Sequence, residues 1–272
     1  MARAPEPDAV NRPATYLDRI VAWHRDRAAA DARNVGDLED RCGDMSPARG
    51  FRDRLISDSA DGLAVIAEIK RRSPSKGDLN IDLDPAEVAI AYRDGGASCL
   101  SVLTDENHFG GSITDLQIAS AASGLPVLRK DFTVSALDVL DARLMGADCV
   151  LLIVAALSDG ELAEFHGLAR AVGLDVLVEV HDEAELDRAV AIGADLIGVN
   201  QRDLTTFEVD HARAVRVGAR MPSSVVRIAE SGVRGSDDAA SLRAAGFHGV
   251  LVGESIVTSV DPVAAVSALR RA

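Results

Sequence analysis

From about residue 64 onward, short apolar runs alternate with longer stretches that have the 3.6-residue period of amphipathic helices. Several of the helical stretches close on Gly-Ala or Gly-Phe, where glycine takes its usual place at a helix C-terminus. The pattern therefore predicts eight strands alternating with helices. The runs are AVIAEIK (64–70), SCLSVLT (98–104), PVLRKDF (126–132), DCVLLIV (148–154), DVLVEV (175–180), DLIGVN (195–200), VVRIAES (225–231) and HGVLVGE (248–254).

Each run is too apolar for a sheet that exposes one face to water, and the alternation with helices is typical of a parallel sheet. Eight such units in a chain of 272 residues favour a (β/α)₈ TIM barrel over an open doubly wound sheet. No GxGxxG sequence follows any run, which argues against a dinucleotide-binding fold. We therefore expect an α/β protein built as a closed barrel.

The first 48 residues stand outside this repeat and read as one or two helices. Leu17, Ile20 and Val21 form an apolar stripe at helical spacing, and Trp23 widens it on one side. Such a stripe must be buried, so we expect residues 1–48 to be a helical extension that caps the barrel formed by residues 49–272. The stretch SPARGFRDRL reads as a connector into the first strand.

Composition narrows the class of protein. The longest apolar run, Cys149 to Leu157, is far too short to span a bilayer, and the N-terminus lacks the apolar stretch of a signal peptide. A net charge of −14 argues against a nucleic-acid-binding surface. The other two cysteines, Cys42 and Cys99, form no CxxC pair with each other or with Cys149, which argues against disulfides and structural zinc. We expect a cytoplasmic protein without membrane or nucleic-acid partners.

Lysine is rare in this chain, since only Lys70, Lys76 and Lys130 occur among 29 basic residues. Arginine provides nearly all of the solvent-exposed positive charges. Lysine differs from it because its compact ammonium group can lose a proton when it is desolvated. Lys70 and Lys130 lie at predicted strand ends, which makes them candidates for chemistry. Lys76 lies in a loop, where a remnant of the biased composition is a sufficient explanation.

Active sites of TIM barrels lie at the C-terminal ends of the strands. Glu68 and Lys70 are two residues apart at the end of the first strand, so their side chains point the same way. Any one polar strand end is equally consistent with a salt bridge at the rim, but the whole set predicts a site with coupled titrating groups. The set is Glu68, Lys70, Lys130, Asp131, Glu179, Asn200, Arg202, Glu230 and Ser231.

Glycine-rich loops follow the last two strands, as AESGVRG and LVGES. Loops at these positions form the usual phosphate site of such barrels. The backbone N–H groups expected to face the anion are those of Ser231, Gly232, Gly253 and Glu254.

Other chemistries leave weaker signals. The six histidines show no HxH or HExxH spacing, so we expect no metal site, and His108 and His181 are expected to face solvent or form hydrogen bonds. At Lys130, the residues leave open whether a Schiff base or general acid catalysis operates.

Seven motifs in order along the chain together resemble the indole-3-glycerol-phosphate synthase family of tryptophan biosynthesis. The resemblance extends from about residue 15 to the C-terminus and includes the N-terminal extension. They are IAEIKRRSPSKG, LTDENHFGGS, PVLRKDF, LVEVHDEAEL, IGVNQRDLTTF, AESGV and LVGESIV. The resemblance implies a decarboxylating and dehydrating ring closure of 1-(2-carboxyphenylamino)-1-deoxyribulose 5-phosphate to indole-3-glycerol phosphate. It also implies a small phosphorylated substrate and no cofactor or metal.

By the same resemblance, Lys130 matches the general acid that protonates the ribulose carbonyl as the aryl carbon attacks it. Glu68 and Lys70 match acid–base and anchoring groups, and Glu179 matches a further carboxylate assigned to proton transfer. How the later proton transfers divide among Glu68, Lys70 and Glu179 stays open.

The resemblance also implies binding residues. Ser73 matches a contact to the substrate carboxylate, and Phe109 and Phe132 match apolar walls for the aryl ring. The groups around the sugar hydroxyls and the reacting centre match Asn200, Arg202, Glu230 and Ser231. The phosphate-binding loops match Gly232, Gly253 and Glu254. Two positions depart from the pattern: Gln201 stands where a small residue or Asn is expected, and Glu254 puts a carboxylate near the expected phosphate.

Two other readings remain to be tested. The sibling phosphoribosylanthranilate isomerase would favour a Cys and Asp pair at opposite strand ends, but strand one here ends in Glu-x-Lys and strand three in Lys-Asp. A non-catalytic barrel that binds a phosphorylated ligand would not need the acid–base set. Oligomeric state and association with other pathway enzymes are left open.

Overall fold

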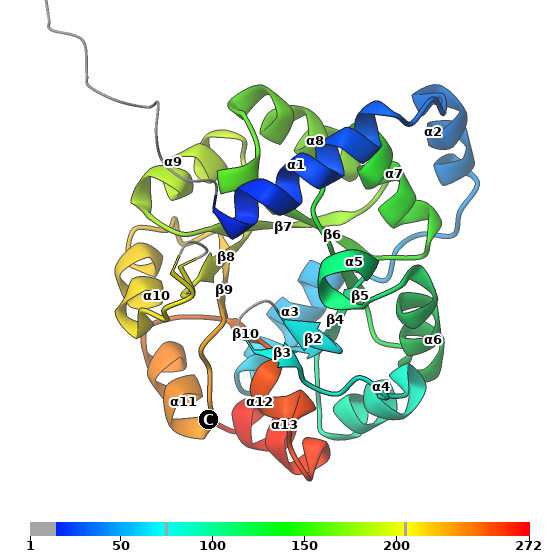
Figure 1. Ribbon diagram of the computed structural model, residues 1–272. Coiled ribbons are helices and arrows are strands. Elements are labelled where there is room, and N and C mark those ends of the chain that lie inside the picture. Colours follow the sequence, from blue (N-terminus) through cyan, green and yellow to red (C-terminus); the bar gives the residue numbers. More distant parts are fainter. Residues whose placement is uncertain (1–14, 74–75, 204–205) are drawn as a thin grey trace, which may run out of the picture.

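The computed structural model describes residues 15–73, 76–203 and 206–272, and its central feature is a closed parallel barrel (Figure 1). The strands pair in the order β1-β10-β9-β8-β7-β6-β5-β4, and β4 returns to β1. Each strand falls within a predicted run, which confirms the TIM barrel. The strands are β1 (Ala64–Ile69), β4 (Cys99–Leu103), β5 (Val127–Lys130), β6 (Cys149–Ile153), β7 (Asp175–Val180), β8 (Leu196–Asn200), β9 (Val226–Glu230) and β10 (Gly249–Val252).

An outer ring of helices covers the barrel (Figure 1). Side-chain caps begin many of these helices, and α8 has a full capping box in which Ser158 and Glu161 each bond the other's backbone N–H. The ring is formed by α4 (Pro85–Asp94), α6 (Ile113–Ser123), α7 (Ala136–Leu144), α8 (Asp159–Ala171), α9 (Glu183–Ala191), α10 (His211–Gly218), α11 (Ser236–Ala244) and α13 (Pro262–Arg270).

Short elements that the periodicity did not predict lie in the loops that follow strands. A small hairpin pairs β2 (Arg72–Ser73) with β3 (Gly77–Asp78) after β1. Single-turn helices follow β4, β6 and β10, namely α5 (Glu106–Phe109), the 3₁₀ helix η1 (Val154–Ala156) and α12 (Glu254–Val257). These elements are too short to produce a hydrophobic period, so sequence pattern alone cannot detect them.

The alternation of side chains along each strand divides the core in two. On β1, Ala64 and Ile66 join an inner cluster within the barrel, whereas Val65 and Ala67 join the larger cluster beneath the helices. Glu68 is the next residue on the inward face of β1, so the rule that places Ile66 inside the barrel also aims Glu68 into its open end.

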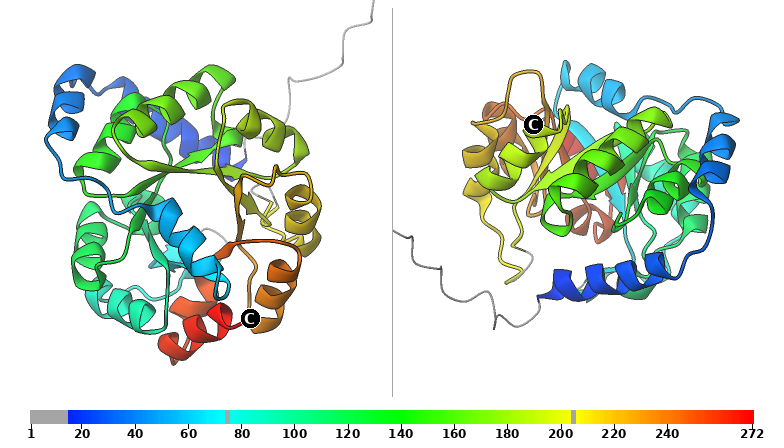
Figure 2. Two further views of the ribbon diagram at one scale, coloured as in Figure 1. Left: turned by 180° about the vertical axis from the view of Figure 1, so that it is seen from behind. Right: turned by 90° about the horizontal axis from the view of Figure 1, so that it is seen from above.

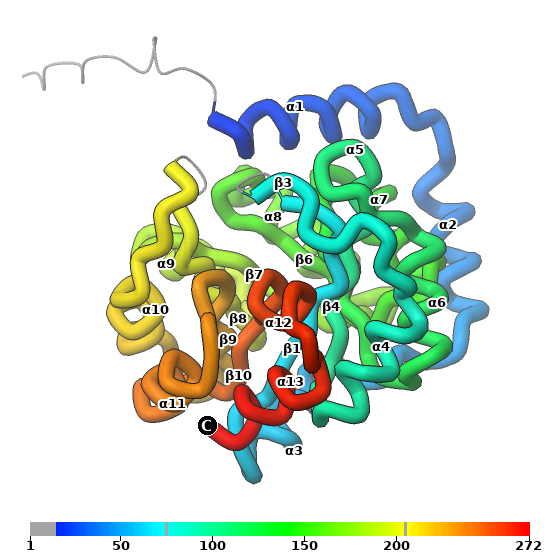
Figure 3. Tube along the Cα trace, turned by 60° about the horizontal axis from the view of Figure 1, so that its bottom comes forward, coloured from blue at the N-terminus to red at the C-terminus, as the bar shows by residue number. Residues whose placement is uncertain are grey.

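From residue 15 onward, where the structure describes the chain, three helices precede the barrel: α1 (Tyr16–Ala29), α2 (Val35–Gly43) and α3 (Phe51–Ser59). The side view in Figure 2 and the tube in Figure 3 place α1 and α3 at opposite ends of the barrel. The expectation of a connector at SPARGFRDRL is wrong, because α3 begins at Phe51. Phe51 and Leu55 lie one turn apart, are fully buried and pack into the inner cluster, so α3 plugs the N-terminal end.

Helix α2 packs on the outside of the barrel. Its Leu38 and Cys42 form a separate buried cluster with Leu137 and Leu140 of α7.

Cys42, Cys99 and Cys149 are all buried, and each is a free cysteine. Among the described residues, no helix is both long and apolar enough to cross a membrane.

Helix α1 lies across the C-terminal end of the barrel (Figures 1 and 3). Ile20 is buried as expected, but Trp23 is 40% exposed and packs edge-on against His24 and His108. His24 takes the buried position instead, and its Nε2 lies 2.9 Å from the Asp105 carboxylate. The apolar stripe is therefore narrower than expected, and a buried polar contact helps to fix α1.

Candidate active site

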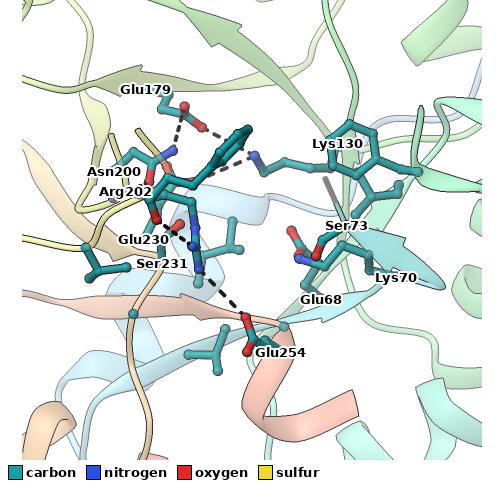
Figure 4. A pocket seen from close by; sticks show the side chains of 18 of the residues that line it. Glu68, Lys70, Ser73, Lys130, Glu179, Asn200, Arg202, Glu230, Ser231 and Glu254 are labelled. Atoms are coloured by element: carbon teal, nitrogen blue, oxygen red, sulfur yellow. Dashed lines mark hydrogen bonds and ion pairs between the residues drawn. The ribbon is translucent and has the colours of Figure 1, made fainter. Parts of the chain in front are cut away.

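The C-terminal strand ends surround a cavity of about 460 Å³, a volume suited to a small ligand (Figure 4). Every site residue expected from the sequence lines this one cavity. The lining includes Glu68, Lys70, Ser73, Phe109, Lys130, Phe132, Glu179, Asn200, Arg202, Glu230, Ser231, Gly232, Gly253 and Glu254.

At the centre of the cavity, the Lys130 ammonium faces two carboxylates (Figure 4). Its Nζ donates to Glu179 Oε2 at 3.3 Å and lies 3.9 Å from Glu230 Oε2. Both carboxylates are almost fully buried, at 1% and 2% exposure. Lys130, Glu179 and Glu230 are the last inward-facing residues of β5, β7 and β9, so barrel closure brings them together.

Burial and mutual charge set the protonation states of this cluster. Burial raises the pKa of Glu230 to about 8, helped by the neighbouring Glu179. Burial alone would also raise the pKa of Glu179, but Lys130 and His181 more than offset it and lower that pKa. Burial would lower the pKa of Lys130, yet Glu179, Glu230 and Glu68 raise it. At neutral pH the cluster therefore combines an ammonium, a carboxylate and a protonated carboxyl.

Glu68 and Lys70 are ion-paired at the end of β1, as their two-residue spacing predicts. The Glu68 backbone carbonyl accepts a hydrogen bond from the buried Tyr92 hydroxyl at 3.3 Å. This contact ties the end of β1 to α4, so the strand backbone that carries the pair is held in place.

Two glycines make room for the buried carboxylates. A Cβ atom built at Gly198 on β8 would overlap Glu230 Oε1, and one built at Gly253 would press on the Glu68 carboxylate. Gly253 was expected only as a phosphate-binding position, and Gly198 was not singled out. Their absence of a side chain allows Glu230 and Glu68 to occupy their places in the barrel.

Asn200 connects the central cluster to the rim. Its Nδ2 donates to Glu179 Oε1 at 3.0 Å, and its Oδ1 accepts from the Arg202 backbone N–H at 3.0 Å. Gln201, one of the two departures from the family pattern, is buried, and its amide donates to the Ser231 carbonyl at 2.8 Å. The larger side chain at position 201 thus braces the loop after β9 from outside the cavity.

The loop after β9 and the start of α12 form the side of the cavity expected to bind phosphate. Ser231 (φ 64°) and Gly232 (φ 74°) both adopt left-handed backbone conformations. Such strain in a non-glycine residue clusters at functional sites. Glu254, the second departure, is half-exposed and lies 3.6 Å from Lys76 Nζ and 3.7 Å from the Arg202 guanidinium. Its charge is balanced by two cations.

Aromatic and apolar side chains close the opposite side. The Phe109 and Phe132 rings lie 6.2 Å apart, and Tyr16, Leu17 and Ile20 of α1 extend this wall. The Tyr16 ring packs edge-on against Phe207, at 5.6 Å between centroids, so α1 contacts the loop after β8.

Several lining residues were missed by the sequence interpretation, including Lys76, Phe207 and Arg234. Lys76 carried a usable signal, because the scarcity that marked Lys70 and Lys130 applies to it equally: all three lysines of the chain line the cavity. Phe207 carried none, since its left-handed backbone and its contact with α1 depend on the folded loop.

One group among the described residues could bring three metal-ligand atoms together, namely His24, Asp105 and His108, whose atoms lie within 4.8 Å of one another. Both imidazoles are already hydrogen-bonded to Asp105 Oδ2, at 2.9 and 2.8 Å. The geometry is that of a carboxylate bridging two histidines, which links α1 to α5 beside the cavity.

Two solved structures share the fold at low sequence identity. Thiamine phosphate pyrophosphorylase from Pyrococcus furiosus matches 78% of this chain and 95% of its own, with a TM-score of 0.57 and 17% identity. The N-acetylmannosamine-6-phosphate 2-epimerase from Clostridium perfringens has a TM-score of 0.57 and 12% identity, over 73% of this chain and 90% of its own. At these identities the likeness supports the barrel fold alone.

Sequence relatives are much more similar. A Nocardioides indole-3-glycerol phosphate synthase is 49% identical over 254 residues, which cover 93% of this chain and 96% of the relative. Indole-3-glycerol phosphate synthase 2 of Streptomyces coelicolor is 52% identical, over 82% of this chain and 85% of its own. The family model named indole-3-glycerol phosphate synthase matches residues 17–269. With the barrel and its acid–base rim already established, this match shows that the chain belongs to the indole-3-glycerol phosphate synthase family.

Proposed function

We propose that this cavity catalyses the ring closure of 1-(2-carboxyphenylamino)-1-deoxyribulose 5-phosphate to indole-3-glycerol phosphate, carbon dioxide and water, in tryptophan biosynthesis. The observation that carries the proposal is the Lys130 ammonium held between two buried carboxylates, in a cavity with an aromatic wall on one side and glycine-rich loops on the other. The reaction needs these three features in one place.

In the proposed reaction, the aryl carbon that bears the carboxylate attacks the ribulose carbonyl, and the carbonyl oxygen gains negative charge. Lys130 donates a proton to that oxygen, and its positive charge stabilises the transition state. Loss of carbon dioxide returns the bonding electrons to the ring. The new hydroxyl then leaves as water, which requires a second acid and a base.

The cluster offers groups for the second half of the reaction. We propose Glu179 as a carboxylate that accepts a proton, and Glu68 with Lys70 as the pair that completes dehydration. Glu230 carries its own proton at neutral pH, because burial raises its pKa to about 8. It can therefore donate a hydrogen bond to a sugar hydroxyl or to the leaving oxygen.

Substrate binding follows the same division of the cavity. We propose that Phe109 and Phe132 hold the aryl ring and that Ser73 contacts its carboxylate. Asn200 and Arg202 would orient the sugar hydroxyls beside Glu230 and Ser231. The phosphate would bind to backbone N–H groups of Ser231, Gly232, Gly253 and Glu254.

We further propose that residues 1–48 cap the cavity and that residues 49–272 form the catalytic barrel. Residues 1–14 lie outside the described part, so the cap is argued from α1 alone, whose Tyr16, Leu17 and Ile20 line the cavity. Membership of the family also supports a cytoplasmic location, which we propose for this protein. We propose in addition that the molecule bound at this site is a small phosphorylated substrate.

A turnover assay tests the proposal directly. The carboxyphenylamino substrate should give indole absorbance and fluorescence at a rate proportional to enzyme. Phosphoribosylanthranilate should not be isomerised in parallel reactions. Binding of the carboxyphenylamino compound without turnover would favour a non-catalytic barrel and overturn the proposal.

Gly198→Ala should lower kcat about tenfold, because the new methyl group must displace the Glu230 carboxylate, and small displacements of reacting groups are costly. Gly167→Ala on α8 is the matched control, since a Cβ at that position meets nothing within 4 Å. Steady-state kinetics and thermal unfolding of both variants check the prediction. Equal kcat values for Gly198→Ala and wild type would mean that Glu230 moves without consequence.

Turnover should survive EDTA treatment followed by dialysis, because protein side chains supply every acid and base in the proposed reaction. The rate is measured before chelation, after it, and after adding back Zn²⁺, Mg²⁺ or Mn²⁺. A loss of activity that one of these ions restores would contradict the cofactor-free mechanism, and the group formed by His24, Asp105 and His108 would then be tested as the metal ligands.

A further inference from the structure

His181 contacts Glu179 without lining the cavity. It follows the end of β7, and its imidazole is clamped between two carboxylates. Its Nε2 lies 3.4 Å from Glu179 Oε1, and its Nδ1 lies 3.0 Å from Glu185 Oε2 on α9. The backbone N–H of His181 donates to the same Glu185 oxygen at 2.8 Å. Glu185 thus fixes both the backbone and the ring of His181.

Each oxygen of Glu179 faces its own partners. Oε2 accepts from Lys130, on the side of the reacting centre. Oε1 accepts from Asn200 Nδ2 and faces His181 Nε2. The carboxylate is therefore approached by Lys130 from β5, by Asn200 from β8 and by His181, whose ring is also held from outside the barrel by Glu185.

The charges in this cluster balance when the histidine is protonated. Burial alone would lower the pKa of His181, but its contacts with the Glu179 and Glu185 carboxylates raise that pKa to about 10. Lys130 and His181 then carry two positive charges against the negative charges of Glu179 and Glu185, while Glu230 carries its proton at neutral pH. Without the imidazolium, Glu179 would keep Lys130 as its cationic partner, but Glu185 would lose the cation that the described ion pairs give it.

We propose that His181 is a positioning residue for the ring closure: as an imidazolium anchored by Glu185, it holds Glu179 ionised and turned toward Lys130. This inference rests on the proposed function, in which Glu179 accepts a proton. The positive charge of the His181 imidazolium favours the ionised form of Glu179, and the fixed position of the imidazole ring limits rotation of the Glu179 carboxylate.

His181→Gln removes the charge while keeping a polar side chain. We expect kcat to fall about tenfold. This is the low end of the roughly 10–100-fold losses that follow when a residue supporting a metal ligand is removed, and His181 supports Glu179 in a comparable way. KM should change by less than about twofold, since His181 does not line the cavity. Losing a nearby cation makes Glu179 easier to protonate, so the acidic limb of the kcat profile should move to higher pH by about one unit.

His166→Gln is the matched control, because His166 lies on α8 and is absent from the cavity lining. Its kcat, KM and pH profile should equal those of wild type. His181→Lys should return the acidic limb toward its wild-type position, because it restores the positive charge. Glu185→Gln should shift the limb in the same direction as His181→Gln, because it removes the anchor of the imidazolium.

The outcomes separate this inference from the proposed function. No turnover by the wild-type enzyme would reject the function itself. Wild-type turnover together with an unchanged kcat and acidic limb in His181→Gln would reject the positioning role alone. Should that variant fail to fold by circular dichroism, Glu185→Gln decides the question: an unshifted limb in that variant overturns the proposal.

Discussion

Replacing Lys130 with methionine should abolish ring closure and leave the fold and substrate binding largely intact. The variant loses both the general acid and the positive charge beside the developing oxyanion, so kcat should fall by at least about 10²–10³-fold. Methionine is close to lysine in length, and Glu179 keeps its contacts with Asn200 and His181, so the cluster should tolerate the change. Turnover, substrate affinity and thermal unfolding together check this prediction.

Lys76→Met provides a contrast from the same cavity. Lys76 is largely exposed, and the ion pair described for it joins Glu254 rather than the central carboxylates. Its loss should raise KM and leave kcat nearly unchanged. A Lys130→Met enzyme that kept half of the wild-type turnover would overturn the assignment of the general acid.

Removing residues 1–30 should weaken substrate binding while the barrel still folds. The truncation deletes α1, including Tyr16, Leu17 and Ile20 of the cavity wall, but keeps α2 and its contacts with α7. Deleting residues 1–46 instead would also expose Leu137 and Leu140, so the shorter truncation is the cleaner test. Lost apolar burial of about 1–3 kcal/mol corresponds to a rise in KM of roughly 5- to 150-fold.

The double variant Leu17→Ala/Ile20→Ala should reproduce part of this rise without removing the helix. Ile118→Ala, at a 39% exposed position on α6, controls for the loss of an isoleucine elsewhere. Steady-state kinetics of all three proteins measure KM. A truncated enzyme with wild-type KM and kcat would show that α1 is only an arm beside the cavity.

The barrel and its rim could be predicted from the sequence because both follow from local rules. Strand runs and helical periods recur along the chain, and side chains alternate along each strand, so Glu68 and Lys70 were expected on one face and form an ion pair. The C-terminal ends of parallel strands meet at one edge of the barrel, which is why their order along the chain is enough to place Lys130, Glu179 and Glu230 together.

The features that were missed depend on contacts between distant parts of the chain. Helix α3 has only Phe51 and Leu55 as buried residues, and their partners come from strands throughout the barrel. The ion pair of Lys76 joins the loop after β1 to Glu254 at the start of α12, far along the chain. Glu179 and Glu185 lie close to His181 in the sequence, but the role proposed for His181 depends on Lys130 and Asn200, which reach Glu179 from other strands. None of these contacts leaves a periodic trace in the sequence.

The plug formed by α3 has a consequence for the order of assembly during translation. Phe51 and Leu55 are synthesised before every strand, yet the inner cluster that receives them extends to Leu251 on β10, close to the C-terminus. The helix therefore leaves the ribosome long before its binding site exists. Its apolar side chains can be buried only after the strands have paired into a closed barrel. Contacts between such distant residues slow folding, because the chain must be brought together before they form. Packing of α3 against the N-terminal end of the barrel is thus expected among the last steps of folding.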